Sequence, residues 1–332
     1  MQRKYFFLAL LSCQILYSQS IGLEQPNRFL HQLNPSYFGL NAKNKVGLIH
    51  QVTRVNNQKS QEQQYVFGTF SVPNQDFNLS ADFYTNRNTS LGYRENIFRA
   101  SFVYRIQLDQ QLFLLPAISA GFVSTRLNFD DILLEDQVNQ QTGTFTNSSI
   151  DPFLNNFNGL SVNYLDVGVS TLLHHPNFIL GLSASRLNQP SSSSSQEVGE
   201  KYPIKVSFQA AYEYGINRRG NSFSNDSFLY LSMAVTKVQE KIDLALGQDL
   251  QLGSFGLGLN QKLYLRDKMA FSAGVTANVQ YQNFTFGVQF SFPVREINKS
   301  WGPNYFQFFT TFDLTNYRYN IQTTKRLGQS NY

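Results

Sequence analysis

One cysteine and one tryptophan are the only residues of their kinds in this chain of 332 residues. A lone cysteine excludes an internal disulfide bond, which needs two thiols. Beyond the N-terminus there is no apolar run of the roughly 18 residues that a membrane-spanning helix requires. The net charge is +5, but charges of one sign never occur in runs longer than two, which gives no support for a nucleic-acid-binding patch. We therefore expect no nucleic-acid partner.

Signatures of catalysis and of metal binding are also missing. The sequence has no G-x-S-x-G segment, and no cysteine or carboxylate cluster lies near its four histidines at the spacing of metal ligands. The adjacent pair His174 and His175 precedes Pro176, a pattern typical of a turn. We predict no catalytic residue, no metal site and no cofactor, and we expect that the protein is not an enzyme.

What the sequence does contain is long, regular alternation of apolar and polar residues. Residues 270–280 and 283–294 alternate across a tight turn. The apolar face carries Phe271, Ala273, Val275, Ala277, Val279, Phe284, Phe286, Val288, Phe290, Phe292 and Val294. A transmembrane strand needs about 9 to 11 residues, with apolar side chains toward the lipid and small or polar ones toward the interior. The pattern predicts two membrane-spanning strands.

The composition agrees with a membrane barrel. Aromatic residues make up 15% of the chain, and the mean hydropathy of -0.30 is too polar for a helical membrane protein. A β-sandwich would also alternate, but sandwich strands are usually nearer 5 or 6 residues. We predict an all-β fold, a transmembrane antiparallel up-and-down β-barrel of about 14 strands over residues 44–314.

The connections between the expected strands differ in length on the two sides. The expected strands are 45–55, 64–72, 76–86, 97–107, 112–126, 163–173, 178–187, 204–214, 227–237, 241–250, 253–265, 268–280, 283–294 and 304–314. Connections after even-numbered strands are mostly tight, apart from 215–226, whereas those after odd-numbered strands include 56–63, 127–162 and 188–203. Outer-membrane barrels have short periplasmic turns and longer outer loops, so we expect both chain ends in the periplasm.

The N-terminus indicates export. Two basic residues precede the apolar run 5–11, and small residues follow near position 20, so residues 1–20 are expected to be a secretory signal. Cys13 lies in a loose match to a lipoprotein cleavage box and is either acylated or removed with the signal. Residues 21–43 are expected to form a periplasmic segment, and residues 315–332 a periplasmic tail. The expected location is the cell outer membrane.

The tail is one candidate for partner binding. Arg318, Lys325 and Arg326 accompany three tyrosines there, and arginine and tyrosine recur at interface hot spots. A frayed terminus is the alternative.

A long loop is the other candidate. Asp130 and Asp131 begin its densest acidic group. Carboxylates suit calcium, but the spacing matches no compact calcium loop, and a solvated loop is the alternative. We keep both aspartates as candidate partner-binding residues.

Two arginines are expected inside the barrel. Arg99 and Arg105 alternate with apolar residues that face outward. They either line a conduit or pair with an acid across the interior, for which Asp166 is the candidate.

The order of several short segments resembles a known family. The run 34–39, which begins Asn-Pro-Ser, precedes the first strand; a hairpin at 98–105 and 116–122 follows, and then an aspartate-containing strand and a Pro-Asn turn within 163–187. In this order, over residues 25–314, they resemble the PorP/SprF family, outer-membrane barrels of the type IX secretion and gliding machinery. Members typically carry Asn-Pro-Ala in the first segment.

The resemblance implies a role in protein secretion. It implies membrane lipid as surroundings, and as partners a secreted cell-surface adhesin or its C-terminal domain, together with periplasmic or outer-membrane subunits of type IX secretion. We accordingly expect an accessory or attachment component. The alternative is a passive channel or hydrophobic-solute transporter, since a barrel of about fourteen strands can be either filled or open.

Overall fold

The chain forms a closed antiparallel β-barrel. The computed structural model describes residues 23, 29–40, 44–55, 58–72, 75–89, 92–127, 160–191, 201–216, 227–265, 269–295 and 303–314. Their sheet has 16 strands, but two of these are two-residue continuations of one hairpin, so 14 long strands form the wall. The first long strand pairs with the last, which closes the barrel.

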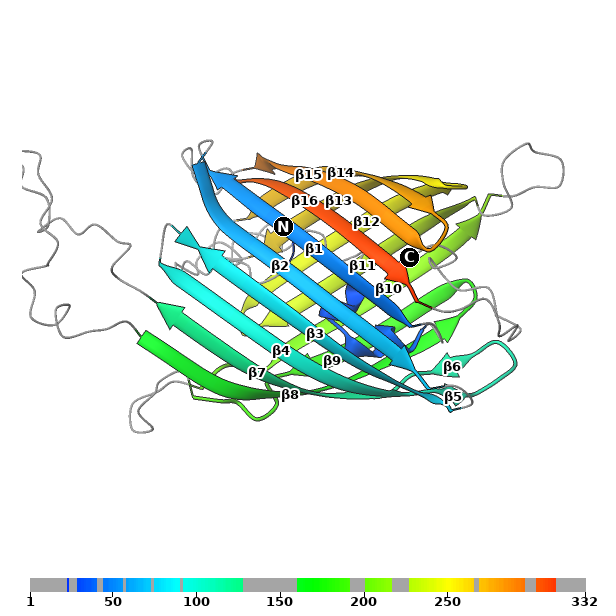
Figure 1. Cartoon of the computed structure of the whole chain (residues 1–332), viewed down its shortest axis with the longest axis horizontal. Helices are drawn as coiled ribbons and strands as arrows, with labels where there is room; N and C mark the ends of the chain where they lie inside the picture. Colours follow the sequence, from blue (N-terminus) through cyan, green and yellow to red (C-terminus); the bar gives the residue numbers. More distant parts are fainter. Residues whose placement is uncertain are drawn as a thin grey trace, which may run out of the picture.

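Each long strand is paired with the next long strand along the chain (Figure 1). The long strands are β1 (Lys45–Val55), β2 (Gln58–Ser71), β3 (Phe77–Asn88), β4 (Tyr93–Tyr104), β7 (Ala117–Leu127), β8 (Leu160–His175), β9 (Phe178–Ser185), β10 (Lys205–Gly215), β11 (Phe228–Val238), β12 (Lys241–Leu252), β13 (Phe255–Leu265), β14 (Ala270–Tyr281), β15 (Phe284–Arg295) and β16 (Asn304–Asp313). The short ones are β5 (Ile106–Gln107) and β6 (Phe113–Leu114). The predicted up-and-down barrel is confirmed.

Burial alternates along the strands, as the sequence pattern predicts. On β14 the outward Val275 and Val279 are 51% and 43% exposed, whereas the inward Thr276 and Asn278 are 2% and 5% exposed. On β15 the outward Phe286, Val288, Phe290, Phe292 and Val294 are all exposed. Exposed apolar side chains on every long strand would be unstable in water, so this outer face is the surface that contacts lipid.

The first outer connection is shorter than the sequence suggested. The sequence predicts a connection between two strands at residues 56–63. Instead β2 begins at Gln58, pairs with β1 and contains an irregularity opposite Thr53 and Arg54. Strand pairing depends on backbone hydrogen bonds and not on apolar side chains. A polar segment can therefore continue β2 beyond the part of the wall that faces lipid.

The two ends of the barrel differ in their connections. The turns 176–177, 253–254 and 282–283 lie at the end where β1 starts and β16 finishes, since Lys45 pairs with Asp313. The opposite end carries the connection between β7 and β8. That end also has two-residue connections at 56–57 and 239–240, but its connection 128–159 is by far the longest. Because the longer loops of such barrels are the outer ones, we expect both ends of the strand series on the periplasmic side. The connection after β10 is long although it is on this side, and its residues 217–226 lie outside the described part.

Candidate functional site: a plug inside the barrel

A compact segment lies inside the barrel wall. Residues 29–40, which we call the plug, contain two short 3-10 helices, η2 (Leu30–Gln32) and η3 (Pro35–Gly39), drawn in dark blue within the barrel in Figure 1. Asn34 caps η3, since its side-chain oxygen accepts a hydrogen bond from the Ser36 N–H at 3.0 Å, and Pro35 occupies the first helical position. Among the described residues no helix has the length and apolar character needed to cross a membrane.

Aromatic packing holds the plug against β2 and β16. The Phe29 ring meets the Phe309 ring edge-on at 5.3 Å, and Phe38 lies 6.1 Å from Phe67 between ring centroids. All four side chains are buried.

We expected residues 21–43 to form a periplasmic segment; the described part of it, Leu23 and the plug, lies inside the barrel instead. The physical reason is that its apolar side chains are buried among the inward apolar residues of the wall.

Glycines in the wall make room for these rings. A Cβ at Gly47 would lie 2.3 Å from the Phe67 ring, and one at Gly287 would lie 2.0 Å from the Phe309 ring. Both distances are impossible for real atoms, so each ring lies directly over a neighbouring glycine. The inward glycines on β1 and β15 therefore permit the aromatic layer against which the plug packs.

Asn34 fastens one side of the plug to β8, β9 and β10. Its side-chain nitrogen donates to Gln209 Oε1 at 2.9 Å and to the carbonyl oxygens of Thr171 and Leu182 at 3.3 and 3.4 Å. A Cβ at Gly181 would lie 2.8 Å from that nitrogen and 2.7 Å from Gln209 Oε1. Asn34 is fully buried, so glycine at position 181 allows an otherwise blocked contact.

Ser36 and Leu33 extend this attachment. The Ser36 N–H donates to Ser170 Oγ at 3.2 Å, and the two hydroxyl oxygens lie 2.8 Å apart. Ser183 Oγ donates to the Leu33 carbonyl at 2.9 Å. The Asn-Pro-Ser run that carries the family resemblance is therefore the part of the plug that caps η3 and bonds to the wall. The serine hydroxyl adds a contact that the usual alanine cannot make.

Arg99 holds the other side of the plug. Its two terminal nitrogens donate to the carbonyl oxygens of Gln32 and His31, both at 3.2 Å, while its Nε donates to Asp82 Oδ2 at 2.9 Å. The expectation of an inward arginine paired with an acid is correct, but the partner Asp166 is wrong. Asp166 instead accepts from the Arg186 N–H at 2.6 Å.

The second predicted inward arginine is not part of this site. The Arg105 guanidinium lies 4.1 Å from the Phe113 ring centroid, next to the short strands β5 and β6. Arginine over an aromatic face is a favourable cation–π arrangement. Its role at the periplasmic end of the wall is therefore to pack the hairpin.

His31 is enclosed by aromatic rings. Its ring centroid lies 4.1 Å from that of Phe67, 4.9 Å from Phe38 and 5.5 Å from Tyr65. Burial, and then the charges of Lys45 and Arg99, hold its pKa well below the usual value. A protonated imidazole would be a desolvated cation near other cations, so His31 is neutral at physiological pH.

The contacts of the N-terminal residues surround the barrel axis. Thr69 Oγ1 and Asn78 Nδ2 donate to the Phe38 carbonyl at 3.4 and 3.2 Å, and Lys262 Nζ donates to the Leu23 carbonyl at 3.2 Å. With Asn34 and Arg99, these bonds reach β2, β3, β4, β8, β9, β10 and β13. Six of these strands bond to the plug itself, whose Phe29 ring also contacts Phe309 of β16, whereas the β13 bond is to Leu23.

The interior next to the plug is packed with polar side chains. Gln51 Nε2 donates to Gln63 Oε1 at 3.0 Å, and both side chains are at most 2% exposed. Gln289 Nε2 donates to Ser291 Oγ at 2.9 Å, which in turn donates to Asn260 Oδ1 at 3.2 Å. Inward residues of a water-filled pore would be solvent-exposed. These five are buried and bonded within their own groups, and further inward polar side chains of the described wall are buried as well, so the interior around the plug is packed.

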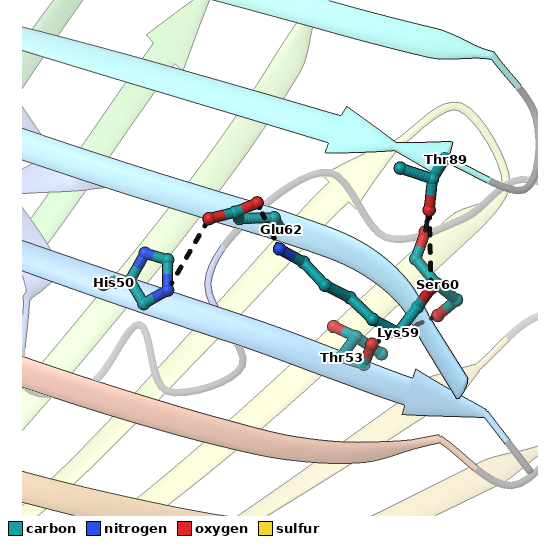
Figure 2. A network of polar contacts seen from close by, with 6 residues as sticks. All are labelled: His50, Thr53, Lys59, Ser60, Glu62 and Thr89. Carbon is teal, nitrogen blue, oxygen red and sulfur yellow. Dashed lines mark hydrogen bonds and ion pairs between the residues drawn. The ribbon is translucent and has the colours of Figure 1, made fainter. Parts of the chain in front are cut away.

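The outer face of β1 and β2 carries a separate polar network, shown in Figure 2. The Glu62 carboxylate lies 2.5 Å from Lys59 Nζ and 3.7 Å from His50 Nε2. Thr89 Oγ1 donates to the Lys59 and Ser60 carbonyls at 3.4 Å and joins the end of β3 to this network. This network lies toward the end of the barrel opposite the one where β1 starts and β16 finishes.

The sequence-predicted partner-binding residues stay predictions. Asp130 and Asp131 in the connection after β7, and Arg318, Lys325 and Arg326 after β16, all lie outside the described residues. Sequence reasoning missed Asn34 and Arg99 as plug contacts. The available signal was the Asn-Pro-Ser run, whose capping pattern indicates a compact turn but not what that turn contacts.

A closed wall with a lipid-facing exterior and a filled interior defines an outer-membrane β-barrel protein. The fold is similar to that of the P. putida toluene transporter TodX, with a TM-score of 0.51 and 8% identity over 86% of this chain and 93% of that one. It is also similar to the CymD monoaromatic hydrocarbon channel, with a TM-score of 0.50 and 8% identity over 91% of this chain and 96% of that one. At such identities the likeness concerns the fold alone.

The sequence comparison identifies the family. The model described as "Type IX secretion system membrane protein PorP/SprF" matches residues 23–312. The chain belongs to the PorP/SprF family, and it is an outer-membrane protein. A search of the curated proteins gave no match. The family match begins at Leu23 and therefore includes the plug as well as the wall.

Proposed function

We propose that this protein is an accessory or attachment component of type IX secretion and works through its surfaces outside the membrane. It would bind a secreted adhesin, or the adhesin's C-terminal domain, on one side and machinery subunits on the other. The observation that carries the proposal is the filled interior, combined with the family membership. A barrel whose inward side chains are buried offers partners its rims and loops rather than a pore.

The plug supports this reading over a passive channel. It is tied to six strands, β2, β3, β4, β8, β9 and β10, by hydrogen bonds, so its release would break many contacts at once. Each such bond contributes about 0.5 to 1.5 kcal/mol, more when one group is charged. A solute path along the axis would require that rearrangement for every opening, whereas a docking role requires none.

The candidate docking surfaces lie at both ends of the barrel. On the outer side these are the connections after β7 and β9, which include Asp130 and Asp131. On the periplasmic side it is the tail with Arg318, Lys325 and Arg326. Opposite charges at the two ends would suit two different partners, and charge complementarity mainly sets specificity and association rate.

The experiment that tests the proposal is deletion of the gene, followed by quantitative surface proteomics and small-solute uptake. The expected result is that one or a few large surface proteins are trapped or unattached, with uptake unchanged. An unaltered surface proteome contradicts the proposal. Lost uptake with normal secretion favours the channel or hydrophobic-solute transporter.

Complementation separates the two surfaces. Removal of residues 316–332 tests the tail, and Asp130→Asn combined with Asp131→Asn tests the acidic loop. Each variant should assemble as a barrel, because neither change touches a described strand. If the surfaces bind partners, at least one variant fails to restore secretion; if both restore it fully, these five residues are not the contacts.

A further inference from the structure

The outer face of β3, β4 and β7 is layered in rows that cross the three strands. Phe83 pairs with Phe98, and Phe98 pairs with Phe122, so three phenylalanines lie side by side on the lipid-facing wall. Their exposed fractions are 42%, 51% and 49%. Aromatic side chains in this position contact the acyl chains of the membrane.

The next row toward the outer end is polar and uncharged. Thr85 pairs with Asn96, and Asn96 with Ser124. Thr85 Oγ1 donates to Asn96 Oδ1 at 2.8 Å on this outward face. The outward side chains therefore change from aromatic to hydrogen-bonding over two residues of each strand. Such a change is expected where a strand passes out of the hydrocarbon layer of the membrane.

The row beyond is formed by three arginines. Arg87 is directly opposite Arg94, and Arg94 is directly opposite Arg126. All three side chains are exposed. Residues directly opposite one another have Cα atoms only about 4.5 to 5.5 Å apart, and like charges in that position are destabilising. Such a row therefore costs some stability unless an anion lies close to it.

The described wall places one outward carboxylate next to this row. Among the described outward residues of β1, β2, β3, β4 and β7, Glu62 has the one carboxylate, and it is opposite Arg87. Figure 2 shows that this carboxylate is turned to His50 and Lys59, with which it forms its ion pairs. Glu95 follows Arg94 in sequence but faces the interior and is 2% exposed.

We propose that Arg87, Arg94 and Arg126 bind the phosphate groups of an outer-leaflet lipid whose acyl chains lie on the phenylalanine row. A guanidinium binds phosphate through two parallel hydrogen bonds, and adjacent arginines can share a headgroup with more than one phosphate. The arginine row lies four residues from the phenylalanine row, about 14 Å along the strand. That separation suits a headgroup above its own acyl chains.

Lys237 differs from the arginine row because no cation is directly opposite it. Lys237, on β11, is an outward, exposed cation at the same end, but its neighbours across the sheet are Val206 and Ile242. Lys237 is a matched control, because it is also an exposed cation near the outer end of its strand but has no cation directly opposite it.

The experiment compares lipid retained by purified full-length protein. Wild type, the triple variant Arg87→Gln, Arg94→Gln, Arg126→Gln, and the control Lys237→Gln are reconstituted in nanodiscs containing diphosphoryl lipid A or a neutral lipid. Native mass spectrometry then counts the lipids that stay bound. We expect the wild type and the control to retain diphosphoryl lipid A, and the triple variant to retain about tenfold less. The neutral lipid should show no difference.

Assembly is checked for each variant by the shift in gel mobility on heating. The triple variant should assemble at least as well as wild type, because it relieves repulsion. Equal retention by assembled wild type and triple variant overturns the proposal, as does equal loss in the Lys237→Gln control. A triple variant that keeps its lipid but loses a co-purifying acidic protein also overturns it, and assigns the row to a protein contact.

Discussion

Asp82 and Arg99 are directly opposite each other on β3 and β4, and their side chains form an ion pair of 2.9 Å inside the barrel. The carboxylate is 2% exposed. The Asp82 carboxylate accepts a hydrogen bond from Nε of the guanidinium. The two terminal nitrogens then point toward the plug and donate to the carbonyl oxygens of His31 and Gln32. The wall thus orients one side chain to hold the N-terminal segment in place.

Breaking this pair should destabilise the barrel more than removing both charges. Asp82→Asn leaves a buried arginine without its counter-ion, and breaking a buried pair by removing one partner costs about 3 to 5 kcal/mol. The double variant Asp82→Asn, Arg99→Gln should recover part of that loss. Urea midpoints followed by heat-modified gel mobility provide the measurement. Equal midpoints for the single and double variants would show that the pair is not coupled.

A methyl group at Gly181 should displace the plug. In Gly181→Ala the new Cβ would lie 2.8 Å from Asn34 Nδ2, so the contact with Gln209 is lost. Gly68→Ala is the matched control, because its nearest neighbour, a Val46 methyl carbon, would be 3.8 Å away. Limited proteolysis near residue 34 should be faster in Gly181→Ala alone. Identical cleavage of both variants would contradict the proposed role of Gly181.

Arginine on the lipid face should be costly at the middle of β15 and tolerated near its end. Val288 and Val294 are both 56% exposed and both face outward. Val288→Arg should cost about 2 to 4 kcal/mol, and Val294→Arg about 0 to 1, because the penalty depends on depth in the membrane. Folding yields into liposomes in urea measure the difference. Similar yields for the two would count against the assigned membrane position.

Acid should loosen the plug through His31. Its pKa is lowered in the folded state, so below about pH 6.5 the unfolded chain binds a proton that the folded one does not, and stability falls as the pH falls. The urea midpoint should therefore decrease between pH 7.5 and pH 5. In His31→Phe this decrease should be smaller, since that site no longer titrates. An unchanged pH dependence in His31→Phe would exclude His31 as its source.

The wall could be predicted from the sequence, and the plug could not. Strand alternation is local, so β14 and β15 reveal their faces within a dozen residues. The plug has no periodicity, and its contacts join residues far apart in the chain, as with Asn34 and Gln209. The choice of Asp166 over Asp82 failed for a related reason: the partner of an inward arginine depends on strand register, which inspection of residue types does not provide.

The most direct test of the filled barrel is single-channel recording of the purified wild-type protein in planar bilayers. The buried interior and the plug held by Asn34 and Arg99 predict no steady ion conductance. Gly181→Ala is expected to show at least transient openings, which would demonstrate that the protein had inserted. A stable, ohmic conductance from the wild type would contradict the filled interior and the attachment role that rests on it.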